Sequence, residues 1–293
     1  MKILALDIGG TAIKAGIVAD GTLESRREVP THAQLGAQSM MERIIALAKE
    51  MLPFDCVGVS TASQVDPHTG VITSANATFP GYTGMPVKQM LEEALRCPVA
   101  VDNDVNCAGF AEGQLGAARD HKDFLCLAYG TGIGMAVVLG GELYYGSRFS
   151  AGEVGHIRTH AGGILCNCGG RGCYEAYAST SALIRQVETA TGQTLTGREI
   201  CALAEAGDRA MESLLSHWVD EVVAGLVSSC HMLNPPCVVL GGGIMSNAWV
   251  FGQVAQRFPG EVMPNYRDTR ILPAALGNDA GMMGAALLAR RLL

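Results

Sequence analysis

Two similar segments, at residues 3–18 and 124–139, most constrain the fold. Residues 3–6 form an apolar run that ends in the turn Asp-Ile-Gly-Gly-Thr, and residues 13–18 resume an extended apolar pattern. Residues 124–129 and 135–139 repeat this plan around the glycine-rich turn 130–134. A strand, a tight glycine turn and a second strand indicate a hairpin rather than a βαβ unit. The sequence therefore predicts two related halves instead of one doubly wound sheet.

The rest of the chain alternates between short apolar runs and stretches with helical spacing, which is typical of an α/β protein. Further strands are predicted at residues 23–29, 56–60, 99–101 and 238–240, and helices at 40–51, 86–95, 104–115, 211–227 and 279–293. Residues 66–84 are rich in turn-forming residues, and residues 152–175 are irregular and rich in glycine. We expect a smaller N-terminal α/β domain over residues 1–117 and a larger C-terminal α/β domain over residues 118–278.

Composition excludes several classes of protein. The chain has 293 residues, of which 48% are hydrophobic and only 17% charged, so intrinsic disorder is not expected. Its net charge of −7 disfavours nucleic-acid binding, which relies on clustered Lys and Arg. The longest apolar run, residues 280–289, is too short to span a membrane, and the early charge of Asp7 argues against a signal peptide. A cytoplasmic protein is expected.

The first glycine turn suits a phosphate group. Gly9 and Gly10 allow backbone N–H groups to approach a phosphate closely, and the hydroxyl of Thr11 can add a donor. Asp7 stands at the end of a buried strand, where it could hold Mg²⁺ through water. The alternative is an ordinary tight hairpin with a satisfied aspartate.

Two other glycine segments are candidates for nucleotide binding. Gly130, Thr131 and Gly132 lack the following helix that a dinucleotide-binding motif requires, so a second phosphate loop fits them better. Gly241, Gly242 and Gly243 end a buried strand, where bare backbone could lie against an adenine or a ribose. Taken alone, this last signal is weak.

Asp102, Asn103 and Asp104 stand where a strand ends and a helix begins. Asp and Asn are preferred helix caps, so capping is one interpretation. The other is that Asp104 acts as a general base toward a hydroxyl, kept ionised by the helix N-terminus. Both can hold if Asp102 or Asn103 is the cap.

A group of metal-binding residue types lies in the glycine-rich stretch. His156, Cys166, Cys168 and Cys173 offer one imidazole and three thiolates, the closed tetrahedral set of a structural zinc site. His160 is a competing imidazole. The other seven cysteines, at 56, 97, 107, 126, 201, 230 and 237, are expected mostly in the core. Glu153 and Glu175 flank the metal loop, either as acceptors for sugar hydroxyls or as solvated surface groups.

Together these motifs resemble the ROK family of bacterial sugar kinases and repressors. The resemblance rests on residues 7–11, on residues 129–134, on Glu153 with Gly155 and His156, and on the spaced cysteines, and it spans essentially the whole chain. It implies the actin-like ATPase (ribonuclease H-like) fold, with two domains closing over a nucleotide cleft and with helix 279–293 packing back on the first domain. It also implies a homodimer.

The resemblance assigns roles residue by residue. Asp104 would be the catalytic base, and Asn103, Glu153, His156 and Glu175 would contact the sugar, with His156 binding zinc through its other nitrogen. The resemblance also implies a set of residues that hold ATP and Mg²⁺: Asp7, Gly9, Gly10, Thr11, Lys14, Gly130, Thr131, Gly132, Gly241, Gly242 and Gly243. Ser63 and Gln64 stand on the sugar side where the family often has glycine, and Met135 replaces a common glycine. Ser63 is therefore also a candidate sugar contact.

These expectations add up to an ATP-dependent kinase that phosphorylates the 6-hydroxyl of a hexose, with glucose first and an N-acetylhexosamine such as N-acetylmannosamine as the alternative. A sugar-responsive transcriptional regulator of the same family is the rival from another class. Such a regulator needs a helix-turn-helix module. The first predicted strand begins at Ile3 and the net charge is negative, so the sequence favours the kinase.

Overall fold

The computed structural model describes residues 1–293, and the chain divides into two compact units. Unit 1 comprises Met1–Leu115, Glu142–Ala151 and Asn278–Leu293, and unit 2 comprises Gly116–Gly141 and Gly152–Gly277. The sequence prediction assigned residues 142–151 to the C-terminal domain, whereas the structure packs them with unit 1. None of the helices combines the length and the apolar character that crossing a membrane requires.

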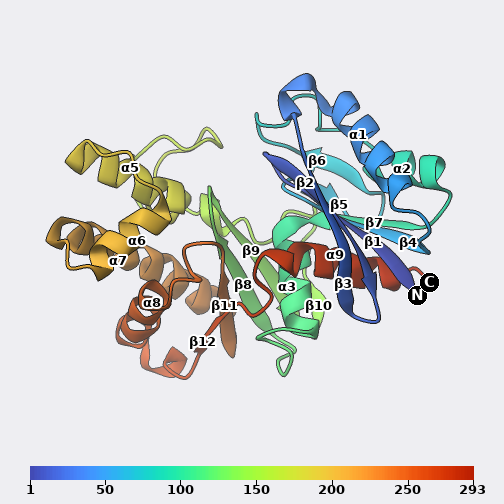
Figure 1. Cartoon of the computed structure of the whole chain (residues 1–293). Helices are drawn as coiled ribbons and strands as arrows, with labels where there is room; N and C mark the ends of the chain where they lie inside the picture. Colours follow the sequence, from blue (N-terminus) through green and yellow to red (C-terminus); the bar gives the residue numbers. More distant parts are fainter. The chain divides into compact units, whose positions relative to one another are not determined.

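Unit 1 is built on a mixed sheet with the strand order β3-β2-β1-β4-β7 (Figure 1). Its strands are β1 (Lys2–Ile8), β2 (Ala12–Ala19), β3 (Thr22–Pro30), β4 (Cys56–Thr61) and β7 (Val99–Asn103). The predicted hairpin is confirmed, because β1 and β2 pair antiparallel from Lys2↔Ala19 to Ile8↔Ile13. Strands β4 and β7 run parallel to β1, so their carboxyl ends meet at one edge of the sheet.

Helices cover both faces of this sheet, which explains why β4 is buried along its whole length and β1 along most of it. Helices α1 (Ala37–Glu50) and α2 (Val87–Leu95) pack on one face around a core that includes Leu4, Leu6 and Val59. Helix α9 (Ala280–Arg290) lies on the other face and also contacts α3 (Asp104–Gln114). The approach of α9 to α3 requires glycine, because a Cβ on Gly284 would stand 1.8 Å from the carbonyl oxygen of Cys107.

The second sheet has the strand order β10-β9-β8-β11-β12; the short strand β10 (Glu142–Leu143) belongs to unit 1, and the other four strands belong to unit 2. These are β8 (Phe124–Tyr129), β9 (Ile133–Leu139), β11 (Cys237–Gly241) and β12 (Arg270–Pro273). The second predicted hairpin is confirmed by the antiparallel pairing of β8 with β9, while β11 runs parallel to β8. The helices are α4 (Glu175–Ala178), α5 (Thr180–Thr191), α6 (Gly197–Glu205), α7 (Arg209–Leu233) and α8 (Ala248–Glu261).

The core of unit 2 forms where α7 packs its apolar face toward the sheet. Trp218 on α7 is fully buried, and its indole N–H donates to the carbonyl of Ser179 at 3.0 Å. Four helices of unit 2 begin at side chains that accept free N–H groups of the first turn: α5 at Ser179, α6 at Thr196, α7 at Asp208 and α8 at Asn247.

Short elements depart from the sequence prediction. The turn-rich stretch contains the small hairpin β5 (Gln64–Asp66) and β6 (Val71–Ser74), and β12 was not predicted. The remaining elements are β10 (Glu142–Leu143) and the 3₁₀ turns Ala33–Leu35, Val154–His156, Pro264–Tyr266 and Gly277–Asp279. Of the seven cysteines expected in the core, all but the half-buried Cys97 are buried.

Candidate functional site

Asp104 is the first residue of α3, directly after the end of β7. Asn103 is the helix cap, because its side-chain oxygen accepts the N–H groups of Val105 at 2.9 Å and Asn106 at 3.1 Å. Its amide nitrogen donates to Asp104 Oδ1 at 2.9 Å and to the carbonyl of Ser63 at 3.2 Å. The cap thus fixes the orientation of the Asp104 carboxylate, so both sequence interpretations of this tripeptide are compatible with the geometry.

The surroundings of Asp104 suit a general base. Burial, followed by the negative charge of Asp7, raises the pKa of Asp104 to about 6, although hydrogen bonds from Val105 and Asn103 oppose that rise. A carboxylate with a pKa near 6 is ionised at neutral pH and yet accepts a proton more readily than an ordinary aspartate.

Asp7 and the first glycine turn lie in the same unit as Asp104. Asp7 Oδ1 accepts the hydroxyl of Ser60 at 2.8 Å, and Lys14 Nζ lies 3.7 Å from Asp7 Oδ2. Within the turn, Gly9 N–H donates to the carbonyl of Ala12 at 3.0 Å, and Gly10 and Thr11 are exposed. An exposed, tight backbone turn beside a carboxylate and a lysine can receive a phosphate with its counter-ion.

Ser63, one of the predicted departures, has a distinctive environment. Its side chain is buried, and its hydroxyl oxygen has no hydrogen-bond partner in the structure. Its backbone carbonyl binds Asn103, which also binds Asp104. An unpaired buried hydroxyl next to this pair is a donor that a ligand hydroxyl could satisfy.

In unit 2, two glycine segments meet at the end of β8. The loop Gly130–Gly132 closes through a 3.0 Å bond from Gly130 N–H to the carbonyl of Gly132. The strand pairing places Gly241 opposite Ala128. A Cβ on Gly242, whose φ is +95°, would stand 2.1 Å from the Tyr129 carbonyl oxygen, so this close approach requires glycine. The structure therefore brings the loop Gly130–Gly132, which is predicted to bind phosphate, and the 241–243 segment together.

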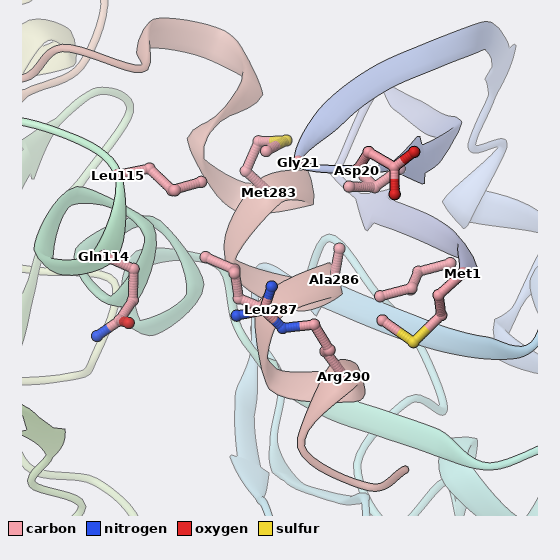
Figure 2. Close-up of a pocket in the computed structure, with 11 residues that line it drawn as sticks. Met1, Asp20, Gly21, Gln114, Leu115, Met283, Ala286, Leu287 and Arg290 are labelled. Carbon is pink, nitrogen blue, oxygen red and sulfur yellow. The ribbon is translucent and has the colours of Figure 1, made fainter.

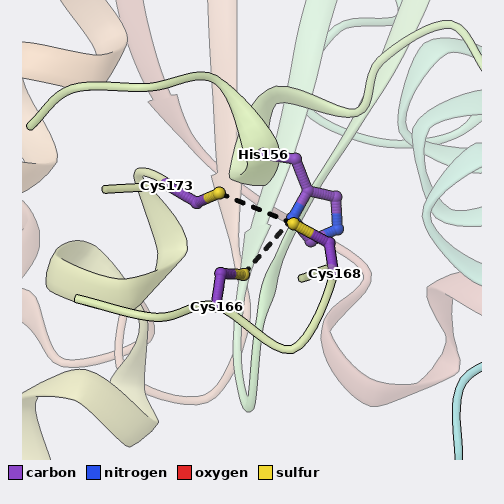
Figure 3. A group of neighbouring side chains, drawn as sticks. All are labelled: His156, Cys166, Cys168 and Cys173. Carbon is purple, nitrogen blue, oxygen red and sulfur yellow. Dashed lines mark hydrogen bonds between the residues drawn. The ribbon is translucent and has the colours of Figure 1, made fainter. Parts of the chain in front are cut away.

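The predicted metal ligands also converge (Figure 3). One donor atom each from His156, Cys166, Cys168 and Cys173 lies within 4.8 Å of all the others. Cys168 Sγ lies 3.6 Å from Cys173 Sγ, and Cys166 Sγ lies 3.7 Å from His156 Nδ1. Zinc bonded to sulfur at about 2.3 Å in a tetrahedron implies donor separations of about 3.8 Å, so the donor set fits zinc.

His156 rather than His160 belongs to this cluster. His160 stacks on Tyr177 with 3.9 Å between ring centroids, and its Nε2 lies 3.5 Å from Glu221 Oε1. Burial raises the pKa of Cys166 to about 12, whereas the Gly170 N–H lowers the pKa of Cys168. A bound cation would favour the thiolate form of each cysteine.

Glu175 links the metal cluster to the second glycine loop. Its Oε1 accepts the thiol of Cys166 at 3.2 Å and lies 3.7 Å from His156 Nδ1. Its Oε2 accepts the Ile133 N–H at 3.4 Å and would stand 2.6 Å from a Cβ on Gly132. Glu153 Oε2 lies 3.8 Å from the other ring nitrogen of His156. Both glutamates therefore flank the metal loop as polar groups beside His156.

Sequence reasoning missed two residues with polar contacts near the site. Ser60 donates to Asp7, and Tyr145 donates to the buried carboxylate of Asp102. The side chain of Met135, which stands where the family often has glycine, lies in the apolar core of unit 2.

A pocket of about 290 Å³ lies elsewhere in unit 1, between the first hairpin and α9 (Figure 2). Met1, Val18, Asp20, Met283 and Arg290 are among its lining residues, and it contains none of the predicted site residues.

Comparison with known proteins shows which family the chain belongs to. Residues 3–292 match the model of the ROK family. A β-glucoside kinase of Listeria monocytogenes is 35% identical, over 97% of this chain and 96% of the relative. The ROK hexokinase structure from Thermus thermophilus has 35% identity and a TM-score of 0.86, covering 100% and 99% of the two chains. A ROK family glucokinase structure from Streptomyces griseus, in complex with glucose and AMPPNP, has 31% identity and a TM-score of 0.88, covering 99% and 100%. The chain therefore belongs to the ROK family and has the actin-like ATPase fold.

Proposed function

We propose that this protein is an ATP-dependent sugar kinase that transfers the γ-phosphoryl group of ATP to the 6-hydroxyl of a hexose, with glucose as its first substrate. The observation that carries the proposal is the Asp104 carboxylate, which is held by Asn103 and has a pKa near 6. The glucose and AMPPNP bound to the Streptomyces griseus relative support the choice of substrates.

In this mechanism Asp104 accepts the proton of the attacking sugar hydroxyl as the new oxygen–phosphorus bond forms, while the bond between the γ-phosphorus and the β,γ-bridging oxygen breaks and ADP leaves. Asn103, Ser63, Glu153, His156 and Glu175 orient the sugar. The glycine turns at residues 9–11 and 130–132 supply N–H groups to the phosphates, and Gly241, Gly242 and Gly243 lie against the adenosine. Positioning and charge stabilisation supply most of the rate enhancement in phosphoryl transfer.

Two metals belong to the proposal. Mg²⁺, when bound, would neutralise charge on the transferring phosphoryl group, and Asp7 is the residue that would hold it through water. Zinc, when bound by His156 and the three cysteines, would have no open position, so its role would be to fix the loop that carries His156.

The test is an ADP-release assay with glucose, fructose, N-acetylmannosamine, N-acetylglucosamine and a β-glucoside, ranked by kcat/KM. Reactions without sugar measure ATP hydrolysis, and mass spectrometry identifies the phosphorylated position. We expect sugar-dependent ADP release with glucose ranked first. A higher rank for the β-glucoside, which the Listeria relative suggests, or for N-acetylmannosamine would overturn glucose but not the kinase. Absence of sugar-dependent ADP release would overturn the kinase.

The regulator alternative is disfavoured because Asp104, Asp7 and both glycine turns are all in place. A homodimer, a requirement for Mg²⁺ and a cytoplasmic location stay predictions. Light scattering coupled to size-exclusion chromatography and the Mg²⁺ dependence of the rate test the first two.

A further inference from the structure

One short segment groups with unit 1, whereas the residues before and after it in the sequence group with unit 2. Residues Glu142–Ala151, here called the strap, belong to unit 1, although the chain on either side belongs to unit 2. Gly141 and Gly152 flank the strap, with φ of +85° and +89°. The chain therefore enters and leaves the strap at residues whose backbone conformation favours glycine.

Polar contacts anchor the strap to unit 1 near both of its ends. Arg291 donates two hydrogen bonds to the Glu142 carboxylate, at 2.5 and 3.0 Å. Ser150 donates to Gln64 Oε1 at 3.1 Å, next to the buried Ser63. Between these anchors, Tyr145 of the strap binds Asp102, the residue before Asn103 in β7.

Tyr145, in the middle of the strap, binds a buried carboxylate. Its hydroxyl donates to Asp102 Oδ2 at 2.6 Å, and Asp102 is only 2% exposed. The other carboxylate oxygen, Oδ1, accepts the N–H of Asn103 at 2.7 Å and the side-chain amide of Asn106 at 3.0 Å. A buried carboxylate is costly unless several donors satisfy it, and Tyr145 is the donor to Oδ2.

Asp102 is in turn connected to Asp104. It holds the backbone of Asn103, whose side-chain amide donates to Asp104 Oδ1. It also holds Asn106, one turn into the helix that Asp104 begins. A change at Tyr145 can therefore reach the Asp104 carboxylate through Asp102 and Asn103, although no contact joins Tyr145 to Asp104 directly.

We propose that Tyr145 is a positioning residue for Asp104 and acts through Asp102. The proposal rests on the proposed function insofar as Asp104 is the base. Without the tyrosine hydroxyl, Oδ2 of Asp102 loses its donor, and the carboxylate becomes free to rotate or to take up a proton. Either change loosens the hydrogen bond from the Asn103 backbone N–H to Asp102, and with it the position of the Asn103 side chain that orients Asp104. Burial raises the pKa of Asp102 and the Tyr145 hydrogen bond opposes that rise, so the loss favours protonation.

The test compares Tyr145→Phe with Tyr144→Phe by steady-state kinetics with the sugar of highest kcat/KM. Tyr144 is the neighbouring residue in the strap and is 53% exposed, so the same substitution there is a matched control. We expect kcat to fall about 10-fold to 100-fold in Tyr145→Phe, since small misplacements of a reacting group have effects of this size. The Tyr144→Phe variant should match the wild type.

Two further variants separate positioning from general loosening of the strap. Glu142→Gln weakens the anchor between Glu142 and Arg291, and we expect it to lower Tm with little effect on kcat. Asp102→Asn should lower kcat, and the double variant Tyr145→Phe/Asp102→Asn should be no slower than Asp102→Asn alone, because both changes act on one path.

The proposal is overturned if kcat of Tyr145→Phe stays within twofold of the wild type, if the two single effects multiply in the double variant, or if Glu142→Gln lowers kcat as much as Tyr145→Phe does.

Amide hydrogen exchange gives a readout that needs no activity. Exchange at Asn103 and Asn106 should accelerate in Tyr145→Phe and not in Tyr144→Phe, and unchanged exchange would overturn the proposal. If the wild type phosphorylates no sugar, the proposed function fails, while the exchange experiment still decides the role of Tyr145.

Discussion

Replacing Asp104 with asparagine should stabilise the folded protein at neutral pH while removing the proposed base. Burial and the charge of Asp7 raise the pKa of Asp104 from 3.8 to about 6. An acid with a raised folded-state pKa binds its proton more tightly when folded, so stability falls as pH rises between those two values. At 1.36 kcal/mol for each pKa unit, the ionised carboxylate costs up to about 3 kcal/mol above pH 6.

The assay is calorimetric unfolding of the wild type and Asp104→Asn at pH 7.5 and pH 4. At pH 7.5 the transition of the variant should lie up to about 6 °C higher, on a scale of roughly 2 °C for each kcal/mol in a chain of this size. At pH 4 the difference should shrink toward zero, because Asp104 is then protonated in the wild-type protein. Asparagine keeps an oxygen that can accept the Val105 N–H, so the helix start is preserved.

The matched control is Asp120→Asn, since the Asp120 side chain is 86% exposed beside Arg119. It should leave the transition nearly unchanged at both pH values. Equal or lower stability of Asp104→Asn at pH 7.5, or a gain that persists at pH 4, would refute the argument that Asp104 carries an electrostatic penalty.

The remaining predictions concern pH, metal and packing. Below pH 6, kcat/KM should fall about tenfold per pH unit because Asp104 becomes protonated; a rate independent of pH from 5 to 7 would argue against it as the base. Metal analysis should find about one zinc ion per chain, and chelation should lower Tm; an unchanged Tm would contradict a stabilising site. Gly284→Ala should destabilise the protein by about 1–3 kcal/mol in urea titrations, because its Cβ would meet the Cys107 carbonyl, whereas Gly252→Ala, with no atom within 4 Å, should not.

Local sequence patterns predicted the parts of the molecule that depend on local chemistry. The two hairpins followed from apolar runs around glycine turns. A helix cap at Asp102 or Asn103 followed from residue types at a strand–helix junction, and the structure identifies the cap as Asn103. The convergence of His156 with three cysteines was predicted because a glycine-rich loop can bring closely spaced donors together. The choice between His156 and His160 needed the structure, since both are close in sequence to the cysteines.

Features that depend on distant contacts could not be predicted in this way. Tyr145 and Asp102 are separated by 43 residues, and nothing in either local pattern announces the hydrogen bond between them. The grouping of the strap with unit 1 could not be predicted, because its contacts, such as that of Glu142 with Arg291, are with residues far away in sequence. Strand β12 has only four residues and ends in proline, so its pattern is too short to identify a strand.

The central claim is that Asp104 is the base of a sugar kinase, and one comparison tests it most directly. Sugar-dependent ADP release is measured at pH 7.5 for the wild type and Asp104→Asn, with sugar binding checked by calorimetry. The account predicts an active wild type and a variant that binds sugar but turns over about 10²-fold to 10⁴-fold more slowly, the usual contribution of a general base. A variant that retains more than a tenth of the wild-type kcat would contradict the account.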